Sequence, residues 1–93
     1  MSKENFSYPL DPSWSTADIV AVTGLFSAVA DAYETGVDRE HLLTSYKAFK
    51  EVVPMKFEEK QLDKDFEAES GYSIYRAIKA ARDSARKQIK IQN

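Results

Sequence analysis

Apolar residues recur at spacings of three and four in four separate stretches of the chain, with short polar turns between them. This spacing is typical of amphipathic α-helices, because residues three and four apart lie on one face of a helix. No stretch alternates apolar and polar residues in the manner of a half-buried strand. The pattern therefore predicts an all-α fold, a compact four-helix array or bundle.

Capping residues set the limits of the predicted helices, which are about 15–35, 38–53, 56–70 and 73–90. Ser15, Asp38 and Ser73 are suited to N-caps, because their side-chain oxygens can accept hydrogen bonds from free backbone N–H groups. Pro54 ends the second helix, since the residue before a proline avoids helical backbone angles. Gly71 is free to adopt the left-handed conformation that commonly ends a helix.

The third predicted helix has the thinnest apolar face, formed by Phe57, Leu62 and Phe66, so we expect it to be the most exposed. The face that the fourth helix turns inward is predicted to contain Ile74, Ile78, Ala81, Ala85 and Ile89. Gly24 costs the first helix about 1 kcal/mol relative to alanine, and we take it as a point where a neighbouring helix approaches closely.

Residues 1–14 have no helical period, and Pro9 and Pro12 hold the residues before them extended. The segment is too apolar for a free tail, since it contains Phe6, Tyr8, Leu10 and Trp14. We therefore expect an extended N-terminal arm laid over the helices, and one helical domain spanning residues 1–93.

The composition excludes several classes of function. Hydrophobic residues make up 43% and charged residues 30% of the chain, a balance typical of globular proteins. The chain has no cysteine, which excludes disulfides and thiolate metal sites and fits the cytoplasm. The absence of a signal-like segment and of an 18-residue apolar run predicts no membrane association.

No catalytic or cofactor-binding pattern is present in the sequence. The only histidine, His41, has no triad-like neighbours, and three scattered glycines cannot form a phosphate-binding loop. The acidic run at 63–72 lacks the glycine and the final glutamate of a calcium loop. We therefore expect no enzyme activity, no cofactor and no metal.

Charge is distributed unevenly along the chain. Residues 1–72 carry a formal charge of −7, and residues 73–93 carry +5. On a helix, one stripe would hold Lys79, Arg82, Arg86 and Lys90, with Arg76 and Lys87 beside it. The candidate anion or partner surface is formed by Arg76, Lys79, Arg82 and Arg86. The simpler interpretation is an amphipathic helix whose outer face is basic, since cations are favoured near a helix C-terminus. We favour the simpler interpretation, because the acidic remainder of the chain would repel phosphates.

Aromatic residues gather near the arm and the turns and form a candidate contact surface of Tyr8, Trp14, Tyr72 and Tyr75. Such side chains can anchor a protein partner or stack on bases. The alternative is that they hold the arm and the turns on the core, and we favour this alternative.

Several segments resemble a known family: PLDPSWST, DIVAV, AYETGVDREHLL, YKAFKEVVP, EEKQL and SGYSIYRA. Together they resemble the uncharacterised YktA-like family of small cytoplasmic proteins from Bacillus and related Gram-positive bacteria. The resemblance covers about residues 4–87 and implies a compact all-helical fold. It implies no activity and no site residues.

The sequence leaves more than one function open. By exclusion we expect a small cytosolic protein-interaction or regulatory module that binds an unknown protein partner or self-associates. The alternative is binding of nucleic acid or another polyanion through the basic face of the C-terminal helix.

Overall fold

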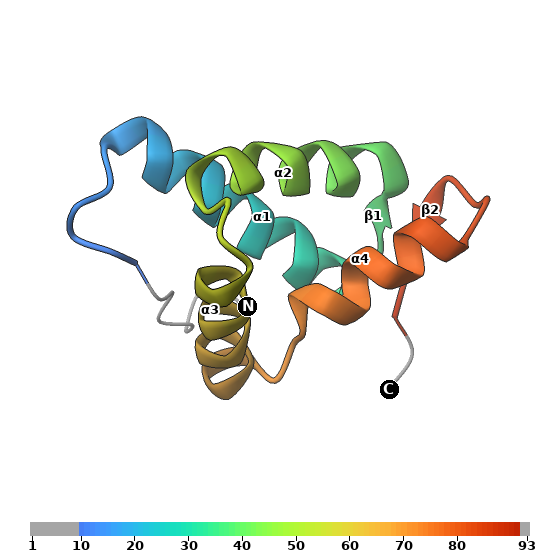
Figure 1. Ribbon diagram of the computed structural model, residues 1–93. Helices are drawn as coiled ribbons and strands as arrows, with labels where there is room; N and C mark the ends of the chain where they lie inside the picture. Colours follow the sequence, from blue (N-terminus) through green and yellow to red (C-terminus); the bar gives the residue numbers. More distant parts are fainter. Residues whose placement is uncertain (1–9, 92–93) are drawn as a thin grey trace.

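The computed structural model describes residues 10–91, which form four α-helices and one pair of very short strands (Figure 1). The helices are α1 Thr16–Glu34, α2 Arg39–Val52, α3 Lys56–Ser70 and α4 Ile74–Asp83. The two strands, which pair antiparallel, are β1 Val37–Asp38 and β2 Gln88–Ile89. The prediction of an all-α fold with four helices is confirmed.

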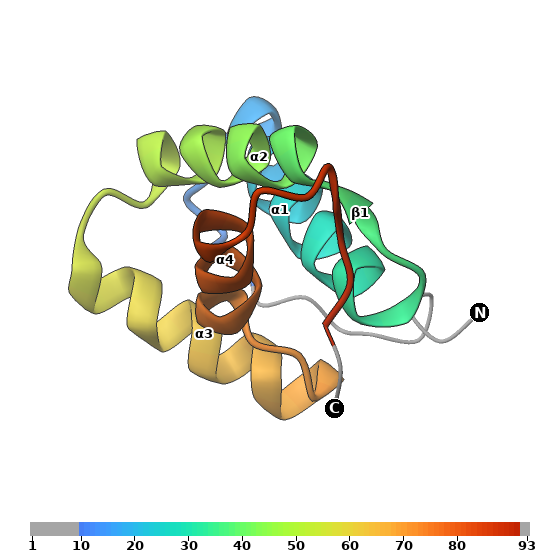
Figure 2. The same cartoon turned by 90° about the vertical axis from the view of Figure 1, so that its right-hand side faces the viewer.

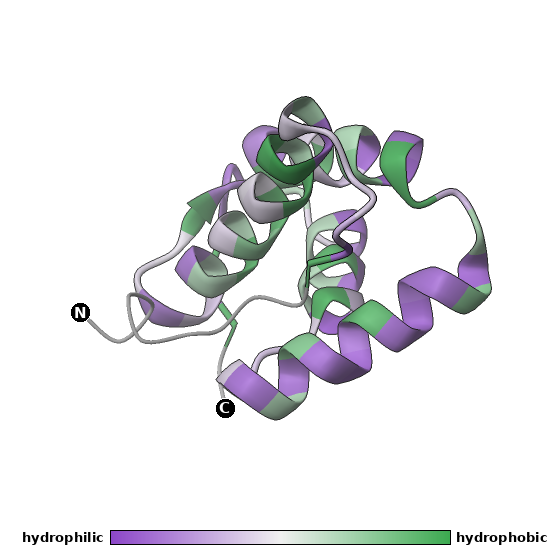
Figure 3. Cartoon of the chain, turned by 90° about the vertical axis from the view of Figure 1, so that its left-hand side faces the viewer, coloured by the Kyte–Doolittle hydropathy of each residue, from purple (hydrophilic) through white to green (hydrophobic). Residues whose placement is uncertain are grey.

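The core lies between α1, α2 and α4, and the most extensive helix packing joins α1 to α2. In Figures 1 and 2, α3 extends away from the α1–α2 pair. Most of its residues are hydrophilic, as Figure 3 shows, and Phe66 is its one buried residue. The Phe66 ring stacks on Phe26 of α1 with 4.5 Å between ring centroids. The expectation that the third helix is the most exposed is therefore confirmed.

The predicted helix caps are present. The Ser15 hydroxyl accepts from the backbone N–H of Asp18, whose carboxylate accepts in return from the Ser15 N–H, so α1 begins with a capping box. The side chains of Asp38 and Ser73 likewise accept backbone hydrogen bonds at the starts of α2 and α4. Gly71 ends α3 with a φ of 81°, a left-handed angle that suits glycine.

The predicted end of the fourth helix is wrong. α4 ends at Asp83, seven residues before the predicted limit, and the chain then turns to form β2. β2 pairs with β1 in the register Val37↔Ile89, so Ile89 is buried as a strand residue. Ala85, which was expected to face inward, is exposed.

Backbone hydrogen bonding to distant segments explains this early end. The Arg39 N–H donates to the Lys87 carbonyl at 2.6 Å, and the Ile91 N–H donates to the Ala32 carbonyl at 2.8 Å. The Arg39 side chain also donates to the carbonyl of Ala81, one of the last-turn acceptors that a helix end leaves free. These partners compete with the i→i−4 hydrogen bonds of a longer helix, and the apolar spacing alone could not reveal them.

The structure also bears on Gly24, Phe57 and the N-terminal arm. Apart from its chain neighbours and the backbone of α1 around it, no atom of residues 10–91 lies within 4 Å of a Cβ built at Gly24, so the expected close approach of a neighbouring helix is wrong. Phe57, assigned to the inner face of the third helix, is 80% exposed. Of the expected arm, residues 1–9 lie outside the described part of the chain, whereas Trp14 packs against the core.

By length and composition alone, α1 could cross a membrane, which the sequence analysis did not expect. Of its 19 residues, eight are buried, including Val22, Phe26 and Val29. Its apolar composition is accounted for by its place as the core helix.

Candidate functional site

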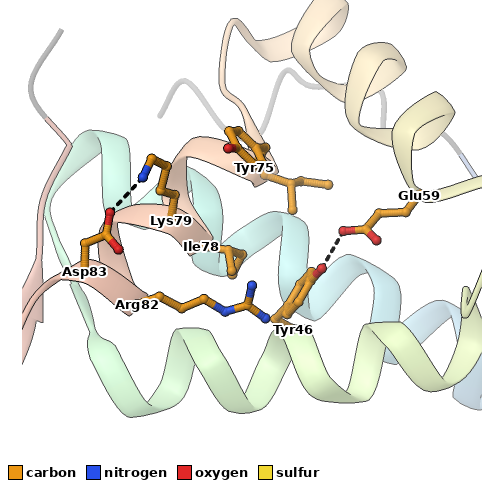
Figure 4. A pocket seen from close by; sticks show the side chains of 8 residues that line it. Tyr46, Glu59, Tyr75, Ile78, Lys79, Arg82 and Asp83 are labelled. Carbon is orange, nitrogen blue, oxygen red and sulfur yellow. Dashed lines mark hydrogen bonds and ion pairs between the residues drawn. The ribbon is translucent and has the colours of Figure 1, made fainter. Parts of the chain in front are cut away.

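A cleft lined by several charged and polar side chains lies between α2, α3 and α4 (Figure 4). One part of it has a volume of about 180 Å³ and is lined by Tyr46, Glu59, Ile74, Tyr75, Ile78, Lys79, Arg82 and Asp83. A second part, of about 360 Å³, adds Lys56, Lys60 and Asp63. Both parts share Tyr46 of α2, Glu59 of α3, and Tyr75 and Arg82 of α4. We call the whole site, defined by these four residues, the three-helix cleft.

A hydrogen-bond network joins α2 to α3 at the floor of the cleft. The Tyr46 hydroxyl donates to the Glu59 carboxylate at 2.6 Å, and the Lys50 ammonium pairs with the other oxygen of Glu59 at 2.7 Å. Burial, and then the hydrogen bond to the Glu59 carboxylate, raise the pKa of Tyr46 to about 12. Tyr46 is therefore a neutral hydrogen-bond donor. The negative charge of Glu59 is balanced by the ion pair with Lys50.

Asp63 fixes the start of α4. Its carboxylate accepts hydrogen bonds from the backbone N–H groups of Ile74 at 2.8 Å and Tyr75 at 3.3 Å. Such N–H groups have no partner within the helix, and an acidic side chain at this end is favoured by the helix dipole. Burial raises the pKa of Asp63 despite these two hydrogen bonds, which lower it.

Arg82 extends from α4 over the ring of Tyr46, with 5.4 Å between the guanidinium carbon and the ring centroid. This distance is typical of a cation–π contact. Arg82 is exposed, and within residues 10–91 no carboxylate lies at ion-pairing distance from it. Across the cleft, the Tyr75 side chain is 67% exposed.

We predict that Tyr46→Phe lowers the free energy of unfolding by about 1 kcal/mol at neutral pH, because one hydrogen bond is lost. The pKa of Tyr46 is raised from 10.0 to about 12 in the folded protein, so its contribution is complete below pH 10. That contribution is lost as the pH rises toward 12, because the unfolded chain releases this proton first.

Urea unfolding between pH 7 and alkaline pH measures this difference, which should narrow as the pH rises. Tyr75→Phe is the matched control, since the structure gives the Tyr75 hydroxyl no hydrogen-bond partner within residues 10–91. An equal cost for both variants would show that the Tyr46–Glu59 hydrogen bond contributes nothing to stability.

A second hollow, on the other side of α3, is mainly apolar. It has a volume of about 300 Å³, and its apolar walls are Trp14, Val52, Val53, Phe57 and Leu62. Asp11, Ser13, Glu58 and Gln61 complete its lining. We call this hollow, defined by Trp14, Val52, Phe57 and Leu62, the apolar groove. Beside it in the chain, Met55 is 62% exposed.

The structure divides the predicted basic surface. Arg76, Lys79 and Arg82 lie on α4, but Arg86 lies beyond its end and lines a separate hollow near Asp38. The four residues are therefore not a continuous helical stripe, and this part of the prediction is wrong. Lys79 pairs with Asp83 at 2.9 Å, and this hydrogen bond raises the pKa of Lys79.

The predicted aromatic residues do not form one surface. Tyr8 lies outside the described residues, Trp14 lines the apolar groove, and Tyr75 lines the three-helix cleft. Tyr72 stacks on Tyr33 with 4.6 Å between centroids. The Tyr72 hydroxyl also donates to the Glu34 carboxylate. Tyr72 thus fastens the turn before α4 to the end of α1, as the structural alternative proposed.

Sequence reasoning did not identify Tyr46 or Glu59 as site residues, and it placed Phe57 on the inner face of the third helix. One available signal was that Tyr46 and Lys50 are four residues apart and so share a face of α2. His41 is exposed at the start of α2 and lines none of the hollows described above. Among residues 10–91, no three His, Cys, Asp or Glu side chains are grouped closely enough to hold a metal ion.

Comparisons of the sequence with known proteins show the family of this chain. The chain is 58% identical over 82 residues to the UPF0223 protein str0998 of Streptococcus thermophilus (strain CNRZ 1066), covering 88% of each protein. It is 52% identical over 87 residues to a UPF0223 protein of Lactococcus lactis subsp. cremoris (strain MG1363), covering 94% of each. The model of the uncharacterised protein family UPF0223 matches residues 5–90. The chain therefore belongs to the UPF0223 family of small proteins from Gram-positive bacteria, whose description assigns no activity.

Proposed function

We propose that this protein is a small, non-catalytic interaction module that binds a protein partner in the cytoplasm. The observation that carries the proposal is the apolar groove, where Phe57 remains 80% exposed. A large aromatic side chain gains about 1.5–3 kcal/mol when it leaves water. An exposed aromatic side chain beside partly buried apolar walls is typical of interaction sites.

The groove also indicates what kind of segment it would hold. Trp14, Val52 and Leu62 supply partly buried apolar walls, and Phe57 is free to close over an inserted side chain. The charged residues of its lining are both acidic, Asp11 and Glu58. A segment with one or two apolar anchors and basic flanking residues would complement this surface in shape and charge.

Capture experiments with matched variants test the proposal. The tagged wild-type protein and a Phe57→Ser variant are used to capture proteins from a lysate of the source bacterium. Val20→Ser is the control, because Val20 is 65% exposed on α1 and lines none of the hollows described above. We expect a partner that is retained by the wild type and the control and is lost with Phe57→Ser. The same proteins captured by all three baits would contradict the proposal.

A photo-crosslinking amino acid at position 57 distinguishes a partner from self-association. A cross-link to a different protein supports the proposed partner. A cross-link only between two copies of this chain would replace the partner by a homodimer, which sedimentation analysis would confirm.

Two further assignments are part of this proposal. We place the chain in the YktA-like group on the segments quoted in the sequence analysis, and we take the cytoplasm as its location because it has no cysteine. Polyanion binding along the C-terminal helix has less support, because Lys79 is paired with Asp83 and Arg86 lies off α4.

A further inference from the structure

We infer that the three-helix cleft is a binding site for a small phosphorylated ligand that carries a planar ring. This inference is independent of the apolar groove, because the two sites share no lining residue. It rests on three features of the cleft: available cations, carboxylates that already have partners, and an exposed aromatic side chain.

The cations are the first feature. Arg82 points into the cleft above the ring of Tyr46, and Lys56 and Lys60 line the α3 side. Within residues 10–91, none of these three side chains lies at ion-pairing distance from a carboxylate. The guanidinium group is planar and presents paired N–H donors whose spacing matches two phosphate oxygens.

The acidic residues of the cleft are the second feature. Glu59 accepts from Tyr46 and pairs with Lys50, and Asp63 accepts from two backbone N–H groups of α4. Asp83 pairs with Lys79. Each carboxylate thus has partners of its own, so an entering anion meets Arg82 and the two lysines without displacing an existing ion pair.

The ring-binding part is the third feature. Tyr75 stands 67% exposed at the cleft, and Ile74 and Ile78 form an apolar wall beside it. A planar ring could stack on Tyr75 while its phosphate reaches Arg82. The part of the cleft between these residues holds about 180 Å³. The adjoining part, which Lys56 and Lys60 line, holds about 360 Å³, so the cleft has room for a ligand with one ring and one phosphate.

Nuclear magnetic resonance titration with phenyl phosphate tests the inference on the full chain at low salt. We expect saturable shifts of the backbone amides of Tyr75 and Arg82. Inorganic phosphate should bind about tenfold more weakly, because it lacks the ring that stacks on Tyr75. Arg82→Gln should weaken binding of phenyl phosphate by about tenfold or more, because a charge-assisted hydrogen-bonded pair is lost.

Arg76→Gln is the matched control, because it removes the same charge from the same helix at an exposed position outside the cleft lining. We expect it to change the affinity by less than about twofold, since exposed charges contribute little at a distance. Tyr75→Ala should reduce the affinity for phenyl phosphate to that for inorganic phosphate.

Three outcomes would overturn the inference. The first is the absence of saturable shifts at millimolar phenyl phosphate. The second is equal weakening by Arg76→Gln and Arg82→Gln, which would indicate general attraction of anions to α4. The third is stronger binding of a single-stranded oligonucleotide with shifts that extend to Arg86, which would indicate a polyanion surface.

Discussion

Replacing Phe66 by alanine should lower the free energy of unfolding by about 3–5 kcal/mol, the usual cost of truncating a buried aromatic side chain. Phe66 has no exposed surface and stacks on Phe26 of α1. It is also the one buried residue of α3. Since a domain of this size has about 5–15 kcal/mol of stability in total, this single change should consume a large part of it.

The matched control for Phe66→Ala lies on the same helix. Phe57→Ala removes the same group from a side chain that is 80% exposed, so we expect a change within about 0.5 kcal/mol. Urea unfolding followed by circular dichroism measures both variants. If Phe57→Ala cost as much as Phe66→Ala, Phe57 would be a core residue, and the apolar groove would not be an open surface.

Replacing Ile89 by alanine should lower the free energy of unfolding by about 2–5 kcal/mol, as for other buried isoleucines. Ile89 is 4% exposed and pairs with Val37 across the small sheet. Its loss should also weaken the protection of the Arg39 amide, which donates to the carbonyl of Lys87. Urea unfolding gives the free energy, and amide hydrogen exchange gives the protection.

Ala85→Glu distinguishes the observed structure, in which α4 ends at Asp83, from a helix that continues to residue 90. The exposure of Ala85 differs between these two arrangements. In the structure Ala85 is exposed, so a glutamate should change the stability by less than about 0.5 kcal/mol. In a helix that continued to residue 90, Ala85 would face the core and the buried charge would be strongly destabilising. A cost as large as that of Ile89→Ala would therefore contradict the observed end of α4.

The helices could be predicted because the signals that define them are local. A serine or aspartate accepts from N–H groups within three residues of itself, as Ser15 and Asp38 do here. The apolar faces of α1 and α2 follow from residue spacing in the same way. Phe57 shows where this reasoning fails, since it lies at the start of α3, where no neighbouring helix covers it.

The three-helix cleft could not be predicted in the same way. Tyr46, Glu59 and Arg82 come from three helices, and their contacts span 13 residues or more along the chain. Periodicity states which face of a helix is apolar, but it does not state which helices meet or at what distance. The sequence marked Lys79 and Arg82 as basic and Tyr75 as a candidate contact residue, but it did not show that they share a cleft or that Lys79 pairs with Asp83.

Local signals in the chain were sufficient to predict the helical class, the number of helices and the exposure of α3 as a whole. They also predicted the caps at Ser15, Asp38, Gly71 and Ser73. The end of α4 at Asp83 and the burial of Ile89 as a strand residue became visible only in the three-dimensional structure. The reason is that caps and periodicity act within one or two helical turns. The strand, in contrast, depends on pairing with β1, about fifty residues away in sequence, and no signal within one or two turns of Asp83 reports that pairing.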